Sequence, residues 1–148
     1  MKSKEDKLVL QNKAIKKAKF MSIDQGIESP IKGAWLFAGR KRNGEGDIQM
    51  LETTDRPRKT MKLLTGTRFQ WIAYNTETKR FFGTGGGNYT AEDGKYTENI
   101  EFFSRDDARV GASLEFDFDV IDGNWHHSGK SSKGDPMYEV WSLRKKQP

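Results

Sequence analysis

The sequence contains no cysteine and only two histidines in its 148 residues. The absence of cysteine excludes disulfides, thiolate metal ligands and cysteine nucleophiles. The two histidines, His126 and His127, are adjacent, and neighbouring residues on a strand point to opposite faces. They cannot easily hold one metal ion together, and a third histidine ligand is missing. No metal site and no cofactor are therefore predicted.

Long hydrophobic runs are also absent. No apolar segment approaches the length needed to cross a bilayer, so no transmembrane segment is predicted. The first residues, Met1 to Asp6, are charged where a signal peptide would turn hydrophobic. Either the protein stays in the cytoplasm, with Met1 as the native start, or a signal peptide has been removed from it.

The excess of positive charge is confined to the N-terminus. The formal net charge is +5, and residues 1–20 alone hold seven lysines against two acids. Residues 21–148 therefore carry 19 basic and 19 acidic side chains. A fold that binds nucleic acid is expected to carry a basic stripe on its body. Specific nucleic-acid binding is not predicted.

The N-terminal segment, residues 1–20, is interpreted as an amphipathic basic helix. Its apolar residues recur at roughly helical spacing, at Leu8, Val9, Leu10, Ala14, Ile15 and Ala18. This spacing predicts a helix over about residues 4–20 with a lysine-rich outer face. The helix either packs on the main domain with its lysines in water or binds an anionic surface or partner. Gly26 and Pro30 mark residues 21–32 as a connector.

From Gly33 onward, short strands alternate with turns. The first expected strand is Gly33–Gly39, with Trp35 and Phe37 on one face. The polar segment Arg40–Lys59 follows and is expected to be a lid or binding loop, or to contain a short edge strand. Further on, strict alternation indicates a strand with one dry face, formed by Leu114, Phe116, Phe118 and Val120.

The central stretch, Phe82 to Phe103, is expected to form a β-hairpin. Ala91–Gly94 supplies a four-residue turn, which would set Tyr89 opposite Tyr96. Period-2 geometry then directs one set of side chains inward, namely Tyr96, Glu98, Ile100 and Phe102.

The same register sets Glu98 opposite Gly87, within the glycine run Gly85–Gly87. A glutamate on an apolar face, opposite a residue with no side chain, indicates a polar group that points into a cavity. The glycine run is not a phosphate loop, because no Lys-Ser/Thr and no helix follow it. It is expected to coil the strand and to leave space for a ligand or a neighbouring side chain.

Asp122-Gly123 is a strong signal for a two-residue hairpin. It aligns Asp119 with His126, which is expected outside. Trp125 and His127 are expected to face inward.

Eight or more short strands, mostly joined by hairpins, predict an all-β protein. The expected architecture is an antiparallel up-and-down barrel of about eight to ten strands, with the N-terminal α-helix outside the run of strands. Closure into a barrel is the usual way in which such a meander removes its exposed edges.

Four motifs follow one another along these strands: Gly33-x-Trp35, Gly85-Gly86-Gly87-x-Tyr89-Thr90, Tyr96-Thr97-Glu98-x-Ile100-Glu101 and Tyr138-Glu139-x-Trp141. The ordered set resembles the lipocalin-like members of the calycin superfamily, and more closely small bacterial lipocalin-like domains of uncharacterised function. The resemblance covers about Ile31 to Arg144 and implies a lipocalin-like β-barrel domain at residues 33–148. Many such relatives are exported, which implies a periplasmic or secreted location if a signal peptide was removed.

The predicted ligand-binding side chains are Trp71, Tyr89, Tyr96, Glu98, Phe102, Phe118, Trp125, His127 and Glu139. In the preferred interpretation, the protein binds a small hydrophobic or amphipathic ligand without catalysis. Glu98 and His127 would anchor it, and the aromatic side chains would form the walls. The same alternation serves a filled core and a lined pocket, so both remain open.

Two other functions remain as alternatives. An isomerase or a hydrolase, including a glycoside hydrolase, would use Glu98 with Glu139 or His127 for acid–base chemistry. A protein interaction module would have a barrel filled by side chains. The two glutamates would then only accept hydrogen bonds and fix the barrel. The oligomeric state is left open, with a homodimer as one option.

Overall fold

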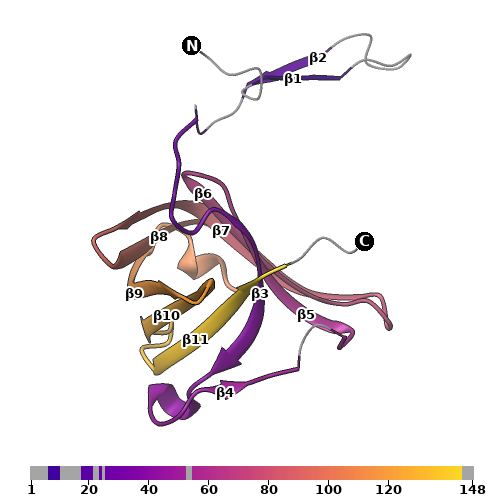
Figure 1. Ribbon diagram of the computed structural model, residues 1–148. Coiled ribbons are helices and arrows are strands. Elements are labelled where there is room, and N and C mark those ends of the chain that lie inside the picture. The colour runs from indigo at the N-terminus through magenta and orange to yellow at the C-terminus, as the bar shows by residue number, and fades with distance from the viewer. Residues whose placement is uncertain (1–6, 11–17, 22–23, 25, 53–54, 145–148) are drawn as a thin grey trace.

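The computed structural model describes residues 7–10, 18–21, 24, 26–52 and 55–144. Eight strands of this part of the chain close into an antiparallel barrel (Figure 1). They are β3 (Gly33–Arg40), β5 (Arg58–Leu64), β6 (Arg68–Asn75), β7 (Arg80–Glu92), β8 (Lys95–Phe103), β9 (Ser113–Ile121), β10 (Asn124–Lys130) and β11 (Pro136–Leu143). Each strand pairs with the next, and β11 pairs with β3. The predicted all-β antiparallel barrel is confirmed.

The long polar segment after β3 contains two short elements. These are the 3-10 turn η2 (Arg42–Gly44) and the edge strand β4 (Gln49–Met50), which pairs with the end of β3. A second 3-10 turn, η3 (Asp107–Arg109), connects β8 to β9. Figure 1 shows the chain entering β3 at one end of the barrel, with η2 and β4 at the other end.

The helix predicted over residues 4–20 is wrong in the parts that the structure describes. Residues Lys7–Leu10 form β1 and Ala18–Met21 form β2, paired antiparallel in a separate two-stranded sheet. Leu8 aligns with Phe20. Segments as short as these fit either a helical or a strand period, and the cross-strand pairing shows that they are strands. The rest of the predicted helix lies outside the described residues, and the division into segments 1–20, 21–32 and 33–148 stays a prediction.

An aromatic core fills the end of the barrel at which the chain enters β3. Ile31 is completely buried just before β3, and its carbonyl accepts a 2.8 Å hydrogen bond from the Trp35 indole nitrogen. The Tyr89 hydroxyl donates to the Thr65 carbonyl between β5 and β6. These contacts close one end of the barrel, so an internal cavity can open only towards the other end.

The hairpin between β9 and β10 has the predicted register. Val120 aligns with Trp125, and Asp119 aligns with His126. Trp125 and His127 are fully buried, whereas His126 is only partly buried. The His126 Nδ1 atom lies 2.7 Å from the hydroxyl oxygen of Tyr138 on β11. The Asp-Gly turn therefore fixes which histidine enters the barrel.

The hairpin between β7 and β8 differs from the prediction in its turn. Glu92 pairs with Lys95, so the turn has two residues rather than four, and Tyr89 rather than Gly87 lies opposite Glu98. The register moves by two positions, which leaves the inward face unchanged. Glu98 is therefore still directed into the barrel.

A bulge on this hairpin overturns the prediction that Phe102 faces inward. Gly87 pairs with Ile100 but Gly86 pairs with Phe102, so Glu101 is an extra residue in β8. An extra residue reverses the side-chain alternation beyond it. Phe102 is 40 % exposed, whereas Phe103 is partly buried and packs on the core.

The glycine run permits this close pairing. A Cβ atom on Gly87 would lie 1.9 Å from the carbonyl oxygen of Asn99, and one on Gly85 would lie 2.5 Å from the Trp71 indole nitrogen. The space beside Gly85 is taken by a neighbouring side chain, as predicted. The space beside Gly87 is taken by backbone and leaves no room for a ligand or a side chain.

Candidate functional site

A partly open cavity of about 220 Å³ lies inside the barrel next to the aromatic core, and it is called the interior cavity below. Most of its walls are apolar: Phe69, Trp71, Ile100, Phe103, Leu114, Phe116 and Met137. Polar side chains also line it, namely Lys62, Glu98, His127, Ser131, Ser132 and Glu139. The barrel is therefore partly hollow, with a mixed lining suited to a small molecule that has apolar and polar parts.

A buried ion pair lies at the centre of this polar group. The Lys62 Nζ atom on β5 lies 2.9 Å from Oε1 of Glu98 on β8, and both residues are more than nine-tenths buried. The Tyr96 hydroxyl donates a second hydrogen bond, of 2.8 Å, to the same oxygen. Burial and the neighbouring Glu98 hold the pKa of Tyr96 well above its usual value, so the hydroxyl keeps its proton.

Three aromatic rings surround the ammonium group of Lys62. Its Nζ atom lies 5.3 Å from the ring centroid of Tyr96, 5.1 Å from Trp125 and 5.3 Å from Trp141. At these distances the ring faces attract a cation. Lys62 is thus stabilised by one carboxylate and three rings, which makes a buried charge tolerable.

His127 packs against the cavity wall as a neutral ring. Its ring centroid lies 4.1 Å from that of Phe116. Burial, and to a lesser degree the charge of Lys62, hold the pKa of His127 well below its usual value. Its Nδ1 atom is buried and has no hydrogen-bond partner among the described residues.

Glu139 lies opposite His127 on β11 and also lines the interior cavity. Burial raises the pKa of this carboxyl, the positive charge of Lys62 lowers it, and Glu98 raises it further. Because burial is the largest of these effects, Glu139 holds a proton more readily than an ordinary glutamate does. As a neutral acid it can donate a hydrogen bond.

The predicted site residues fall into three groups. Those that line the interior cavity are Trp71, Glu98, His127 and Glu139. Tyr96 and Trp125 lie against Lys62, and Tyr89 is buried with Tyr96 in the closed end. Phe118 packs on the core without lining the cavity, and Phe102 lies outside.

Lys62 is the main residue that the sequence interpretation missed. Lys62 lies two residues before Leu64 on β5, so both side chains point to the same face, and Leu64 is buried in the core. This period-2 signal would have placed a lysine inside and called for an acidic partner. Two arginines have other partners: Arg68 pairs with Glu101, and Arg144 donates to the Tyr74 hydroxyl.

A second, larger hollow of about 710 Å³ lies at the end of the barrel near η2 and β4. It is called the mouth groove here, and its lining residues are Phe37, Arg40, Lys41, Arg42, Asn43, Gln49, Ser131, Pro136, Met137, Tyr138 and Glu139. Ser131, Met137 and Glu139 line both hollows. The mouth groove therefore adjoins the interior cavity.

The chain thus forms a closed eight-stranded antiparallel barrel with a cavity inside it. The fold is lipocalin-like. A solved structure described as a lipocalin-like protein from Bacteroides uniformis ATCC 8492 superimposes with a TM-score of 0.52, over 78% of this chain and 100% of that chain. Sequence identity is 11%, so the likeness concerns the fold alone. No protein-family model and no curated protein sequence matches the chain.

Among the described residues, no helix is long and apolar enough to span a membrane. In the same part of the chain, no group of three histidine, aspartate or glutamate side chains could hold a metal ion.

Proposed function

We propose that this protein binds a small, partly apolar molecule in the interior cavity and does not convert it chemically. The observation that carries the proposal is the cavity inside the barrel, whose mainly apolar walls also include the polar side chains of Lys62, Glu98, His127 and Glu139. A small molecule with an apolar body and a polar group fits such a lining.

The arrangement of Glu98 favours binding over catalysis. Its Oε1 atom is held by both Lys62 and Tyr96, which fixes the carboxylate in an ion pair. A buried carboxylate that an ammonium group and a hydroxyl hold together is typical of a structural ion pair.

The cavity volume limits the size of the ligand. Sites for drug-sized ligands usually measure about 300–1,000 Å³, whereas the interior cavity measures about 220 Å³. The ligand part that enters the barrel is therefore small, comparable to a single ring or a medium-length alkyl chain.

Two experiments test the proposal. Native mass spectrometry of protein purified from its own host should reveal a small bound molecule. Isothermal titration with 1-octanol should then compare wild type with Leu114→Trp, which fills the cavity, and with the control Val120→Trp. Leu114 lines the cavity, and Val120 lies on the same strand but is 40 % exposed.

We expect wild type and Val120→Trp to bind 1-octanol alike, and Leu114→Trp to bind it at least about tenfold more weakly, which corresponds to about 1.4 kcal/mol. Equal binding by the two tryptophan variants would contradict a ligand site inside the barrel.

A further inference from the structure

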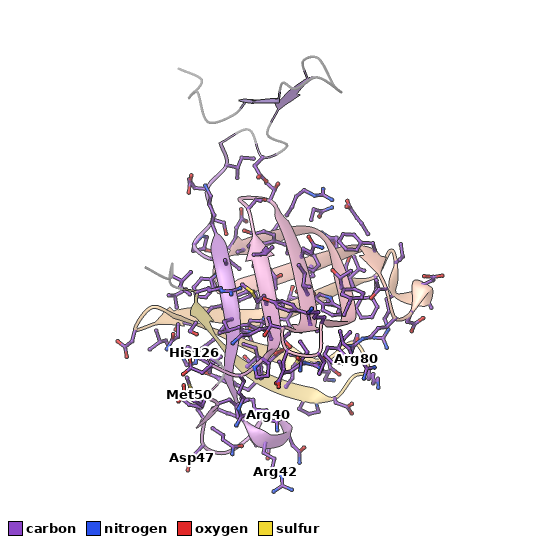
Figure 2. The ribbon with its side chains drawn as sticks, turned by 90° about the vertical axis from the view of Figure 1, so that its right-hand side faces the viewer. Arg40, Arg42, Asp47, Met50, Arg80 and His126 are labelled. Atoms are coloured by element: carbon purple, nitrogen blue, oxygen red, sulfur yellow. The ribbon has the colours of Figure 1, made fainter. Side chains whose placement is uncertain are left out.

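The mouth groove is strongly basic on one side. Three consecutive residues, Arg40, Lys41 and Arg42, lie where β3 ends and η2 begins, and all three line the groove. Figure 2 shows Arg40 and Arg42 together at this end of the barrel. Residues 21–148 as a whole carry equal numbers of basic and acidic groups. The cluster is therefore a local concentration of charge and does not reflect a basic body.

These three cations have no salt bridge among the described residues. Lys41 lies over the ring of Tyr138, 4.2 Å from its centroid, which fixes the lysine without neutralising it. Arg40 and Arg42 are exposed. Glu45 and Asp47 follow closely in the sequence, but neither lines the groove.

Among the described residues that line the groove, Glu139 is the one acidic residue. It lies at the junction with the interior cavity, and burial raises the pKa of its carboxyl. The groove therefore offers three positive charges and a single carboxyl group. Asn43 and Gln49 add side-chain amides that can donate hydrogen bonds.

We propose that the ligand is an amphipathic anion. Its carboxylate, phosphate or sulfonate group binds to Arg40 and Arg42 in the mouth groove, and its apolar part enters the interior cavity. This inference rests on the proposed function, since it names the chemical class of the same ligand.

The chemistry of the two hollows matches such a molecule. The guanidinium group presents paired N–H donors that suit the oxygens of a carboxylate or phosphate. Because Ser131, Met137 and Glu139 line both hollows, a molecule that reaches from the groove into the barrel would pass these three residues. A ligand with a cationic group at the same end would be repelled.

Three probes with the same alkyl chain test the inference: octanoate, 1-octanol and octylammonium. Isothermal titration at pH 7.5 compares wild type with a groove variant, which is the double substitution Arg40→Gln and Arg42→Gln. The charge control, Arg56→Gln with Lys79→Gln, removes the same charge from exposed residues that line neither hollow.

In the groove variant we expect the Kd for octanoate to rise about five- to tenfold, since exposed charge pairs contribute up to about 1 kcal/mol each. The Kd for 1-octanol should stay within about twofold, and octylammonium should bind more tightly than it does to wild type. The charge control should change octanoate binding by less than about twofold. Raising the salt concentration should weaken octanoate binding but not 1-octanol binding.

The outcomes separate this inference from the proposed function. If octanoate and 1-octanol respond alike to the groove variant, or octanoate does not bind, the anionic class is wrong while interior binding of 1-octanol can still hold. If octanoate binding is lost in the groove variant but unchanged in Leu114→Trp, the anion site stands and the interior site is contradicted.

Discussion

The ammonium nitrogen of Lys62 lies 2.9 Å from a carboxylate oxygen of Glu98, and both side chains are buried between opposite walls of the barrel. The two residues are 36 positions apart in the chain. Each compensates a charge that would otherwise be costly to bury, and together they form part of the lining of the interior cavity.

Removal of one partner of this pair should be strongly destabilising. Glu98→Gln leaves the Lys62 ammonium without its counter-charge, so we expect the free energy of unfolding to fall by about 3–5 kcal/mol. The double variant Lys62→Met with Glu98→Gln removes both charges and keeps an acceptor for Tyr96. It should be more stable than Glu98→Gln alone, as measured by urea unfolding. A loss below about 1 kcal/mol for Glu98→Gln would mean that the pair does not exist in solution.

His127 should make the protein acid-sensitive. Its pKa is well below 6.5 in the folded protein, whereas the unfolded chain takes up a proton near pH 6.5. The unfolded state therefore binds more protons below this pH, and wild-type stability should decline as the pH falls from 7 towards 5. Glutamine does not titrate in this range. The free energy of unfolding of wild type should therefore fall relative to that of His127→Gln as the pH decreases, by up to about 1.4 kcal/mol per pH unit. A difference that is constant with pH would contradict a buried neutral ring.

Glu139 should show the opposite pH dependence. Its folded-state pKa is raised above 4.5, so the folded protein retains a proton that the unfolded chain loses. Wild type should therefore lose stability relative to Glu139→Gln as the pH rises from about 4 through the folded-state pKa. Thermal unfolding of both proteins across this range provides the measurement. If Glu139→Gln loses ground instead, a cation pairs with Glu139 and its pKa is lowered.

Gly87 should not tolerate any side chain. A Cβ atom there would lie 1.9 Å from the Asn99 carbonyl oxygen, at the bulge that directs Phe103 inward. We expect Gly87→Ala to cost 3 kcal/mol or more, about the upper end for overpacking. Gly134→Ala is the control, because its φ is +86° but nothing lies within 4 Å of the added atom. It should cost only about 1–2 kcal/mol, the penalty for a left-handed backbone. Similar losses for the two variants would remove the steric argument.

The sequence predicted the barrel and the inward face of its strands because period-2 alternation and the Asp122-Gly123 turn are local signals. The β9–β10 register was correct for this reason. The bulge at Glu101 was missed because it depends on how closely Gly86 and Gly87 approach the next strand, which no local pattern specifies. The result was a wrong orientation for Phe102.

The candidate site was predicted only in part. Glu98 and His127 were recognised as inward-facing polar residues, but the partner of Glu98 was not. Lys62 lies on a strand that is distant in sequence, and its pairing with Glu98 follows from the closure of the barrel. At the N-terminus, the short apolar runs in residues 7–10 and 18–21 fitted a helix as well as a strand, and only their pairing distinguishes the two.

The most direct test of the account is to locate a bound small molecule by NMR. Protein with labelled methyl groups would be mixed with 1-octanol, and intermolecular nuclear Overhauser effects would be recorded. Ile100, Leu114 and Met137 line the interior cavity, whereas Ile27, Ile121 and Met50 are exposed. We predict effects from the alkyl chain to the methyl groups of the first set and none to the second. Effects confined to the exposed methyl groups would contradict a ligand site inside the barrel.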